Sequence, residues 1–339
     1  MPDRDNECVI ALDVGGTGMK GALLDCRLQP LLTQRRPTHR AAGPEAVVAH
    51  MAAALESLAK QASAMGLTAL RAGVVVPGIV DEDSARAVYS GNIGWRDLPL
   101  GAILEQRTGI PVTLGHDVRA GAHAERVLGA ARAARDVLFV PIGTGVSAAV
   151  ISDGRPLRGG GFAGELGHIV VDANGAECVC GGRGCVETVA TAAAIATAFT
   201  VRSGRPVEGA DEVAALVAQR DPHALTVWNR AVDALVTAFT TAVTLLAPGL
   251  IVVGGGLAEA GDLLLDPIRT RLAERLTFQR RPRLVRAELG DQAGCLGAGL
   301  LAWEHMIEPT DDTGESAFPA TRSRSWTARA TRDEPRPSR

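Results

Sequence analysis

The segment CVIALDVGGTGMKGALLD (residues 8–25) places two apolar runs on either side of a glycine-rich turn. The first run, VIALDV, has the composition of a buried strand, and MKGALLD predicts a returning strand. Glycines in the turn let backbone N–H groups approach phosphate oxygens, because no Cβ stands in the way. The segment therefore predicts a β-hairpin whose turn could hold a phosphate, with a plain hairpin turn as the alternative.

The turn also carries residues that suit a nucleotide and its metal ion. Asp13 ends the first strand and could hold Mg²⁺ through water, since Mg²⁺ keeps several waters in proteins. Lys20, one of only two lysines in the chain, offers a point charge, although it could simply face solvent. A strand follows the turn, which excludes a Walker A loop and a helix-opening GxGxxG motif. The candidate nucleotide-binding residues here are Asp13, Gly15, Gly16, Thr17 and Lys20.

The same plan recurs twice along the chain. DVLFVPIGTGVSAAVISDG (136–154) again reads as strand, glycine turn and strand, and GLIVVGGG (249–256) predicts a strand that ends in glycines. Three such turns, each directly after a β-branched strand, suggest one nucleotide contacted from several sides. This repeat predicts two α/β domains with the ligand in the cleft between them. The added candidates are Gly143, Thr144, Gly145, Gly254, Gly255 and Gly256.

Other segments have helical or strand patterns that fill out this α/β plan. RAGVVVPGIV (71–80) predicts a strand that ends in a Pro-Gly turn, and PVTLGHD (111–117) predicts another. Apolar residues at helical spacing predict a helix at 44–65, and we also expect helices at 118–130, 223–248 and 293–306 and in the last part of 249–276.

Composition limits the class of protein. With 339 residues, 46% of them hydrophobic, the chain is long enough for two domains with real cores. A net charge of −3 argues against nucleic-acid binding carried by overall charge. We find no secretory signal and no apolar run long enough for a membrane span, so we expect a cytoplasmic protein. The segment 307–339 is rich in Pro, Ser, Thr, Arg and Asp, which predicts a disordered tail.

Three of the six cysteines lie within ECVCGGRGCVE (177–187). A reducing cytoplasm makes a disulfide unfavourable, and CxC is not the CxxC of a thioredoxin-type redox motif. His168 lies ten residues upstream, so one histidine and three cysteines supply the four ligands of a closed, structural zinc site. The predicted ligands are His168, Cys178, Cys180 and Cys185, with free buried cysteines as the alternative.

These motifs together resemble the ROK family of repressors and sugar kinases. The resemblance rests on DVGGTGMK (13–20), GTGVSAAVISDGRPLRGGGFAGELGH (143–168), CVCGGRGCVE (178–187) and VVGGG (252–256), and it covers about residues 8–305. It implies a two-domain actin-like ATPase (ribonuclease H-like) α/β fold, with an interdomain cleft and a structural zinc loop. The implied domains are 1–118, completed by helix 293–306, and 119–292, followed by the tail.

The resemblance also implies a sugar site and a mechanism. Asp117 would be the general base that takes the proton of the sugar's 6-hydroxyl as that oxygen attacks the γ-phosphoryl group of ATP. Asp117 alone could equally be an N-cap of the helix that follows it. His168 would bind zinc through one ring nitrogen and the sugar through the other. The implied substrate-binding residues are Gly78, Asn92, His116, Asp117, Glu165, His168 and Glu187.

One residue departs from the family pattern. The family usually has Asn directly before the catalytic Asp, and this chain has His116. A neutral imidazole offers one donor and one acceptor, but at a different reach from an amide. We therefore expect a glucokinase-like enzyme, with an N-acyl hexosamine kinase or a catalytically weak sugar sensor as alternatives. The resemblance further implies ATP, Mg²⁺ and zinc as cofactors and a dimer or tetramer. It also implies no DNA-binding domain, because repressors of the family carry that domain before the first phosphate loop, and here this loop begins at Asp13.

Overall fold

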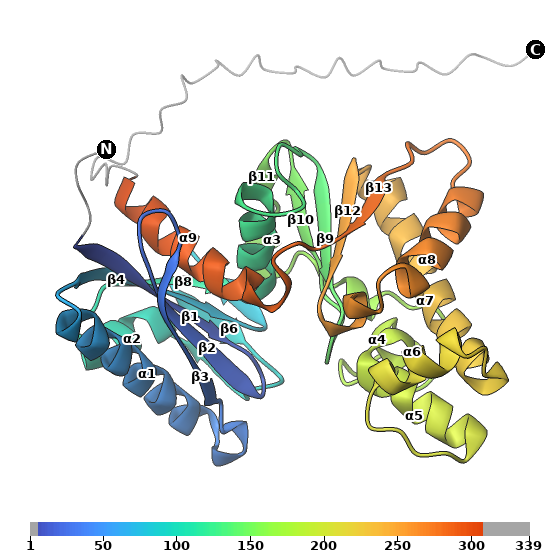
Figure 1. The fold of residues 1–339 in the computed structure, drawn as a ribbon, viewed down its shortest axis with the longest axis horizontal. Coiled ribbons are helices and arrows are strands. Elements are labelled where there is room, and N and C mark those ends of the chain that lie inside the picture. Colours follow the sequence, from blue (N-terminus) through green and yellow to red (C-terminus); the bar gives the residue numbers. More distant parts are fainter. Residues whose placement is uncertain (1–5, 308–339) are drawn as a thin grey trace, which may run out of the picture. The chain divides into compact units, whose positions relative to one another are not determined.

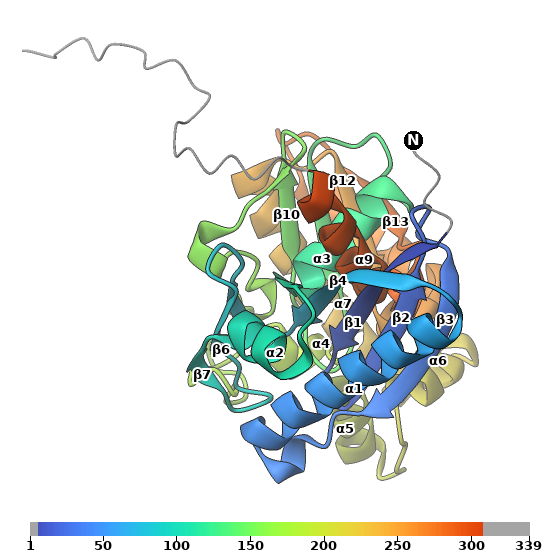
Figure 2. The ribbon, with the colours of Figure 1, turned by 90° about the vertical axis from the view of Figure 1, so that its left-hand side faces the viewer.

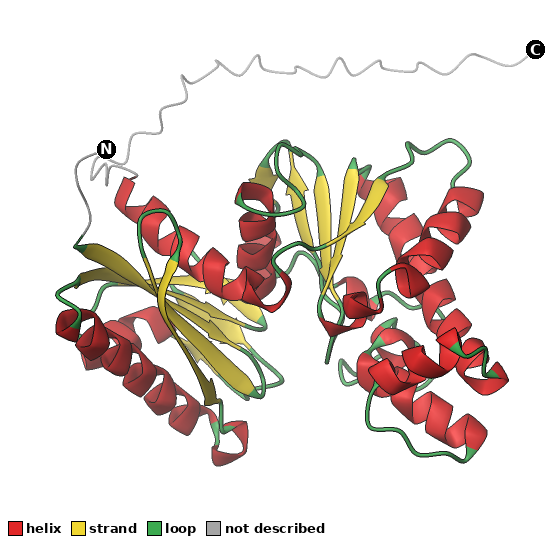
Figure 3. Cartoon of the chain, in the orientation of Figure 1, coloured by secondary structure: helices red, strands yellow, loops and turns green. Residues whose placement is uncertain are grey.

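The computed structural model describes residues 6–307 (Figure 1). Within them, the strands form three sheets, and the helices pack partly on these sheets and partly on one another (Figure 3). The predicted disordered tail lies outside the described residues from residue 308 on.

The first sheet has the strand order β3-β2-β1-β4-β8. β1 and β2 are antiparallel and pair Asp13 with Lys20, which confirms the hairpin predicted at 8–25. β4 and β8 extend the sheet in parallel with β1. The bounds are β1 (Glu7–Val14), β2 (Gly18–Leu24), β3 (Pro30–Pro37), β4 (Thr68–Val76) and β8 (Val112–His116).

The second sheet repeats this plan, with the order β11-β10-β9-β12-β13. β9 and β10 form the antiparallel pair, and β12 and β13 lie parallel to β9. Each sheet thus consists of three antiparallel strands extended by two parallel ones, and the predicted hairpin forms part of the antiparallel half. The bounds are β9 (Val137–Pro141), β10 (Ala149–Ser152), β11 (Arg155–Pro156), β12 (Leu250–Gly254) and β13 (Arg283–Arg286).

A small third sheet follows β4 and contains β5 (Ile79–Asp81), β6 (Arg86–Tyr89) and β7 (Arg96–Leu98). The strand predicted within 71–80 ends at Val76, directly before its Pro-Gly turn, as expected, and β5 begins after that turn. Gly78 has a φ of +105°, and a Cβ there would lie 2.2 Å from the carbonyl oxygen of Tyr89. Only glycine fits this turn.

The predicted helices are present, with somewhat different ends. The predicted helix 118–130 ends at Val127, and 223–248 ends at Leu246, before Pro248. The predicted helices correspond to α1 (Pro44–Ala64), α3 (Asp117–Val127), α7 (Pro222–Leu246), α8 (Asp262–Arg275) and α9 (Ala293–Ile307). The other α-helices of the described residues are α2 (Leu100–Thr108), α4 (Glu187–Ala190), α5 (Ala192–Ser203) and α6 (Ala210–Ala218).

Side chains of β1 alternate between two hydrophobic clusters, because successive residues of a strand point to opposite faces of the sheet. Ile10 and Leu12 pack with α1, which lies across one face of the first sheet (Figure 2). Val9 and Ala11 pack with α9 on the other face. β1 is therefore buried on both faces, which explains its continuous apolar run.

Helices α3 and α9 lie side by side between the two large sheets (Figure 1). Ala122 of α3 packs against Phe139 and Val252 of the second sheet, whereas α9 packs against the first. The helices approach closely, because a Cβ on Gly297 would lie 2.2 Å from the carbonyl oxygen of Ala120.

Candidate active site

The first glycine turn is held by hydrogen bonds from β2 and from the residue that follows β3. Gly15 N–H donates to the carbonyl of Gly18 (2.8 Å), which closes the turn. The buried Thr38 donates its hydroxyl to the carbonyl of Gly15 (2.7 Å) and its N–H to that of Thr17 (3.0 Å). Sequence reasoning missed Thr38, because it lies far along the chain and belongs to no motif.

Asp13 lies at the end of β1, against the first turn of α9. A Cβ on Gly294 would lie 2.6 Å from its Oδ2 atom, so glycine leaves room for this carboxylate. The pKa of Asp13 is raised to about 6, mainly by burial and also by the negative charge of Asp117, with the charge of Lys20 opposing the rise. The carboxylates of Asp13 and Asp117 therefore repel each other electrostatically, and a cation bound near them would reduce this repulsion.

Two basic side chains lie near this turn. The Lys20 ammonium donates to the backbone carbonyl of Asp291 (2.6 Å) and lies 3.8 Å from Asp13 Oδ2, so it binds protein groups rather than facing solvent. The exposed Arg40, by contrast, places its Nη1 atom 3.8 Å from where a Cβ on Gly16 would lie. Sequence reasoning missed Arg40, which follows β3 and belongs to no motif.

The other two glycine turns are neighbours, because they follow the adjacent parallel strands β9 and β12. Ile142 N–H donates to the carbonyl of Gly254 (2.9 Å). Gly255 has a φ of +75°, and a Cβ there would lie 2.4 Å from the carbonyl oxygen of Ile142. The turns 143–145 and 254–256 therefore form one continuous backbone surface.

His116, and not Asp117, caps α3. The helix begins at Asp117, and His116 Nδ1 accepts the backbone N–H of Arg119 (3.3 Å), as an N-cap side chain does. The alternative in which Asp117 serves as the N-cap is therefore wrong. Its Oδ1 atom instead accepts the adjacent N–H of Val118 (2.7 Å). The carboxylate is consequently available for another role.

The surroundings of Asp117 shift its acidity toward neutrality. Burial raises the pKa of Asp117 to about 6, although the N–H of Val118 and the charge of Arg119 oppose this. His116 is also buried, and burial with the nearby Arg119 charge lowers its pKa to about 3. Its ring is therefore neutral at pH 7, with Nε2 3.5 Å from Asp117 Oδ1. A partly buried carboxylate with a pKa near operating pH suits a general base.

Glu165 and His168 lie on one short 3₁₀ turn (Leu166–His168) and its N-cap. His168 Nε2 is 3.7 Å from Glu165 Oε2. Burial raises the pKa of Glu165, His168 lowers it, and the charges of Glu187 and Asp117 raise it further. The structure thus brings together these acidic residues of the predicted sugar site.

Glu187 connects the cysteine loop to the second glycine turn. Its Oε1 atom accepts the backbone N–H of Val146 (2.7 Å) and would lie 2.6 Å from a Cβ on Gly145. Of the other predicted sugar residues, Gly78 shapes the turn after β4, and Asn92 is exposed in the turn between β6 and β7.

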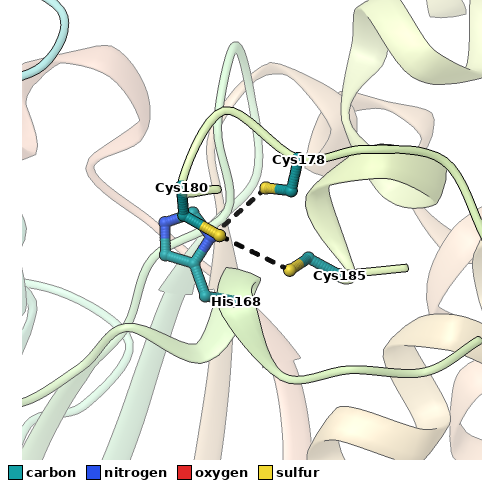
Figure 4. A group of neighbouring side chains, drawn as sticks. All are labelled: His168, Cys178, Cys180 and Cys185. Atoms are coloured by element: carbon teal, nitrogen blue, oxygen red, sulfur yellow. Dashed lines mark hydrogen bonds between the residues drawn. The ribbon is translucent and has the colours of Figure 1, made fainter. Parts of the chain in front are cut away.

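The four predicted metal ligands converge (Figure 4), with all ligand atoms within 4.8 Å of one another. His168 Nδ1 is 3.6 Å from Cys178 Sγ, and Cys180 Sγ is 3.8 Å from Cys185 Sγ. Around a tetrahedral zinc ion, with about 2.3 Å to sulfur and about 2.0 Å to nitrogen, neighbouring ligand atoms lie about 3.6–3.8 Å from one another. The donor set and its spacing therefore fit zinc, and His168 Nε2 points away toward Glu165.

Comparison with known proteins assigns the chain to a family. The sequence profile of the ROK family matches residues 9–305. The chain belongs to the ROK family. It is 32% identical over 329 residues to a glucokinase of Halalkalibacterium halodurans, covering 90% of this chain and 98% of the relative. It is also 32% identical over 299 residues to an N-acetylmannosamine kinase of Citrobacter koseri, covering 86% and 98%.

A solved structure of a ROK family member has the same fold. The ROK glucokinase of Streptomyces griseus, crystallised with glucose and AMPPNP, superimposes with a TM-score of 0.77 at 28% identity, covering 88% of this chain and 99% of that chain. This supports the actin-like α/β fold expected from the resemblance. Among the described residues, none of the helices is both long and apolar enough to span a membrane.

Proposed function

We propose that this ROK protein is an ATP-dependent hexose kinase that phosphorylates the 6-hydroxyl of glucose. The observation that carries the proposal is the partly buried carboxylate of Asp117, whose pKa is raised to about 6 by desolvation. It lies within electrostatic reach of both Asp13, beside the first glycine turn, and Glu165, beside the cysteine loop. Relatives that are glucokinases support glucose as the substrate.

In this proposal the residues of the chain divide the work. ATP would supply the phosphoryl group, and Mg²⁺ would neutralise the negative charge of the phosphates. Backbone N–H groups of the three glycine turns hold the phosphates, and Asp13 fits a Mg²⁺ ion held through water because its carboxylate is buried beside other negative charge. Glu165 and His168 bind sugar hydroxyls, and Asp117 accepts the proton of the attacking one.

The cysteine loop would hold a structural zinc ion. Its four ligands leave no position for water, so the ion would order the loop rather than take part in the reaction. It would fix the imidazole of His168 with Nε2 toward the sugar, and it would hold the backbone that leads to Glu187. We further propose a cytoplasmic homo-oligomer, which gel filtration with light scattering would test.

A second candidate is a kinase for an N-acyl hexosamine. His116 stands where the family usually has Asn, and this residue adjoins the proposed base. The similarity to an N-acetylmannosamine kinase, equal in identity to that of the glucokinase, favours keeping this candidate.

The proposal is tested by coupled ADP release with glucose, mannose, N-acetylmannosamine and no sugar. We expect glucose to give the highest kcat/KM. A preference for N-acetylmannosamine would select the second candidate. Calorimetric sugar binding without sugar-dependent ADP release would show a sensor and overturn kinase activity.

A further inference from the structure

A network of charged side chains, formed by Glu82, Arg119 and Arg158, adjoins the turn that carries the proposed base. Glu82 lies in the turn after β5, and its side chain is mostly buried, with 15% of it exposed. Its Oε1 atom accepts the backbone N–H of His116 (3.2 Å) and the Nε–H of Arg119 (2.9 Å). These two residues flank Asp117 along the chain. One carboxylate therefore holds both sides of the turn that presents the base.

Arg119 is buried, and each nitrogen of its guanidinium group has a hydrogen-bond acceptor. Its Nη2 donates to the carbonyl of Val80 (3.2 Å), and its Nη1 lies at hydrogen-bond distance (3.5 Å) from the carbonyl of Gly161. Gly161 approaches so closely that a Cβ on it would lie 2.7 Å from the Val80 carbonyl oxygen. A buried cation with these fixed acceptors is a rigid connection between α3, β5 and the segment that contains Gly161.

Arg158 connects the same segment to the other oxygen of Glu82. Its Nε atom is 3.1 Å from Glu82 Oε2, and its Nη1 donates to Asp83 (2.7 Å). The chain then runs through Gly161 to Glu165 and His168 within a few residues. Glu82 thus lies between the two arginines. Arg119 follows the proposed base along the chain, and Arg158 belongs to the segment that leads to Glu165 and His168.

We propose that Glu82 is a positioning residue that fixes the separation of Asp117 from the Glu165–His168 segment. In this proposal it acts on the site through His116, Arg119 and Arg158, the groups that its carboxylate contacts. The inference rests on the proposed function, in which the sugar lies between these two groups. A displacement of about 1 Å between a base and its substrate can cost about 100-fold in rate, so a residue that sets this distance controls catalysis.

The test is steady-state kinetics and calorimetric sugar binding on Glu82→Gln, Arg158→Met and the double variant. The amide in Glu82→Gln has nearly the same shape but cannot pair with two guanidinium groups. We expect kcat to fall about 10- to 100-fold and the sugar KM to rise, with the ATP KM unchanged. Arg158→Met should raise the sugar KM and Kd and leave kcat closer to wild type, because the contacts of Glu82 with Arg119 and His116 remain.

The double variant distinguishes positioning from a general loss of stability. If Arg158 acts through Glu82, adding Arg158→Met to Glu82→Gln should raise the sugar KM no further. Arg86→Gln is the matched control, since Arg86 pairs with Asp97 in the same small sheet without reaching this network. It should keep both kcat and sugar KM.

Two results would overturn the inference: a sugar Kd for Arg158→Met within about twofold of wild type, or additive effects in the double variant. If Glu82→Gln does not fold, Arg158→Met and Arg158→Lys still decide the question, because a lysine keeps the charge and should restore part of the sugar affinity. Failure of the proposed function looks different, since wild type would then release no sugar-dependent ADP, and the sugar Kd would still report on Arg158.

Discussion

The backbone N–H of Arg119 donates a hydrogen bond to Nδ1 of His116 at 3.3 Å, and this contact fixes the tautomer of the imidazole. Because Nδ1 is the acceptor, the single proton of the neutral ring must be on Nε2. The acceptor that a free imidazole would offer is thus used by the helix cap. His116 presents only a donor to the site, beside Asp117 Oδ1.

His116→Asn should therefore change sugar preference. Asn is also a good N-cap, so α3 should form as before, but the amide offers the site a different set of donors and acceptors. We expect altered ratios of kcat/KM among glucose, mannose and N-acyl hexosamines, measured by coupled ADP release. Loss of activity with every sugar, at unchanged circular dichroism, would instead make His116 catalytic.

Asp117→Asn should lower kcat by about 10²–10⁴, because it removes the proton acceptor. The sugar Kd should change far less, since the amide oxygen can still accept from Val118 N–H and the side chain keeps its size. Calorimetry and kinetics on one preparation measure both quantities. A kcat within about threefold of wild type, far short of the general-base range, would place the base elsewhere.

The same substitution should stabilise the fold at neutral pH. Burial raises the pKa of Asp117 to about 6, so keeping the carboxylate ionised costs free energy above that pH, on the order of 1–3 kcal/mol. Asp117→Asn removes this cost at pH 7, and its advantage should shrink as pH falls from 6 toward 4. Urea unfolding at several pH values measures it, and an equal gain at pH 4 and pH 7 would contradict this origin.

The wild-type kcat should fall at acidic pH. Only the ionised form of Asp117 accepts a proton, so a pKa of about 6 predicts that kcat declines below pH 6, about tenfold per pH unit. The measurement is kcat at saturating glucose and ATP from pH 4.5 to 8. A constant kcat down to pH 4.5, as an ordinary carboxyl would give, is the contrary result.

Zinc should be present at one equivalent per chain, and Cys180→Ser should lower both thermal stability and sugar affinity. The ion would fix the imidazole of His168 and order the cysteine loop that leads to Glu187, so its loss should loosen both. Metal analysis and calorimetry provide the readouts. Val179→Ala is the control, because that side chain is 96% exposed on the same loop and should change neither. Purified protein without zinc would remove the prediction.

Arg40→Gln should raise the KM for ATP several-fold and leave the sugar Kd unchanged. The guanidinium lies beside the first glycine turn, where a cation can contact a phosphate. The matched substitution Arg35→Gln removes a cation that is already paired with Asp291 and should affect the ATP KM less. Equal ATP KM values for Arg40→Gln and wild type would refute the contact.

The hairpin, the glycine turns and the ligand set of the cysteine loop could be predicted, because each depends on residues close together in sequence. Thr38 and Arg40 could not, since β3 before them is an edge strand whose polar, half-exposed residues give little apolar pattern. Glu82 was equally hidden, because its partners Arg119 and Arg158 come from distant segments. The capping of α3 by His116 was missed, because Asp directly after it is the more usual capping residue.

The packing of α9 on β1 has a consequence for how the protein is made. Val9, Ala11 and Val75 belong to the strands that leave the ribosome first, but the side chains that cover them, among them Ala298 and Trp303, belong to the last described helix. During translation this face of the first sheet stays uncovered until α9 has been synthesised, which happens near the end of the chain. The nascent protein therefore exposes an apolar surface for most of its synthesis, of the kind that chaperones bind.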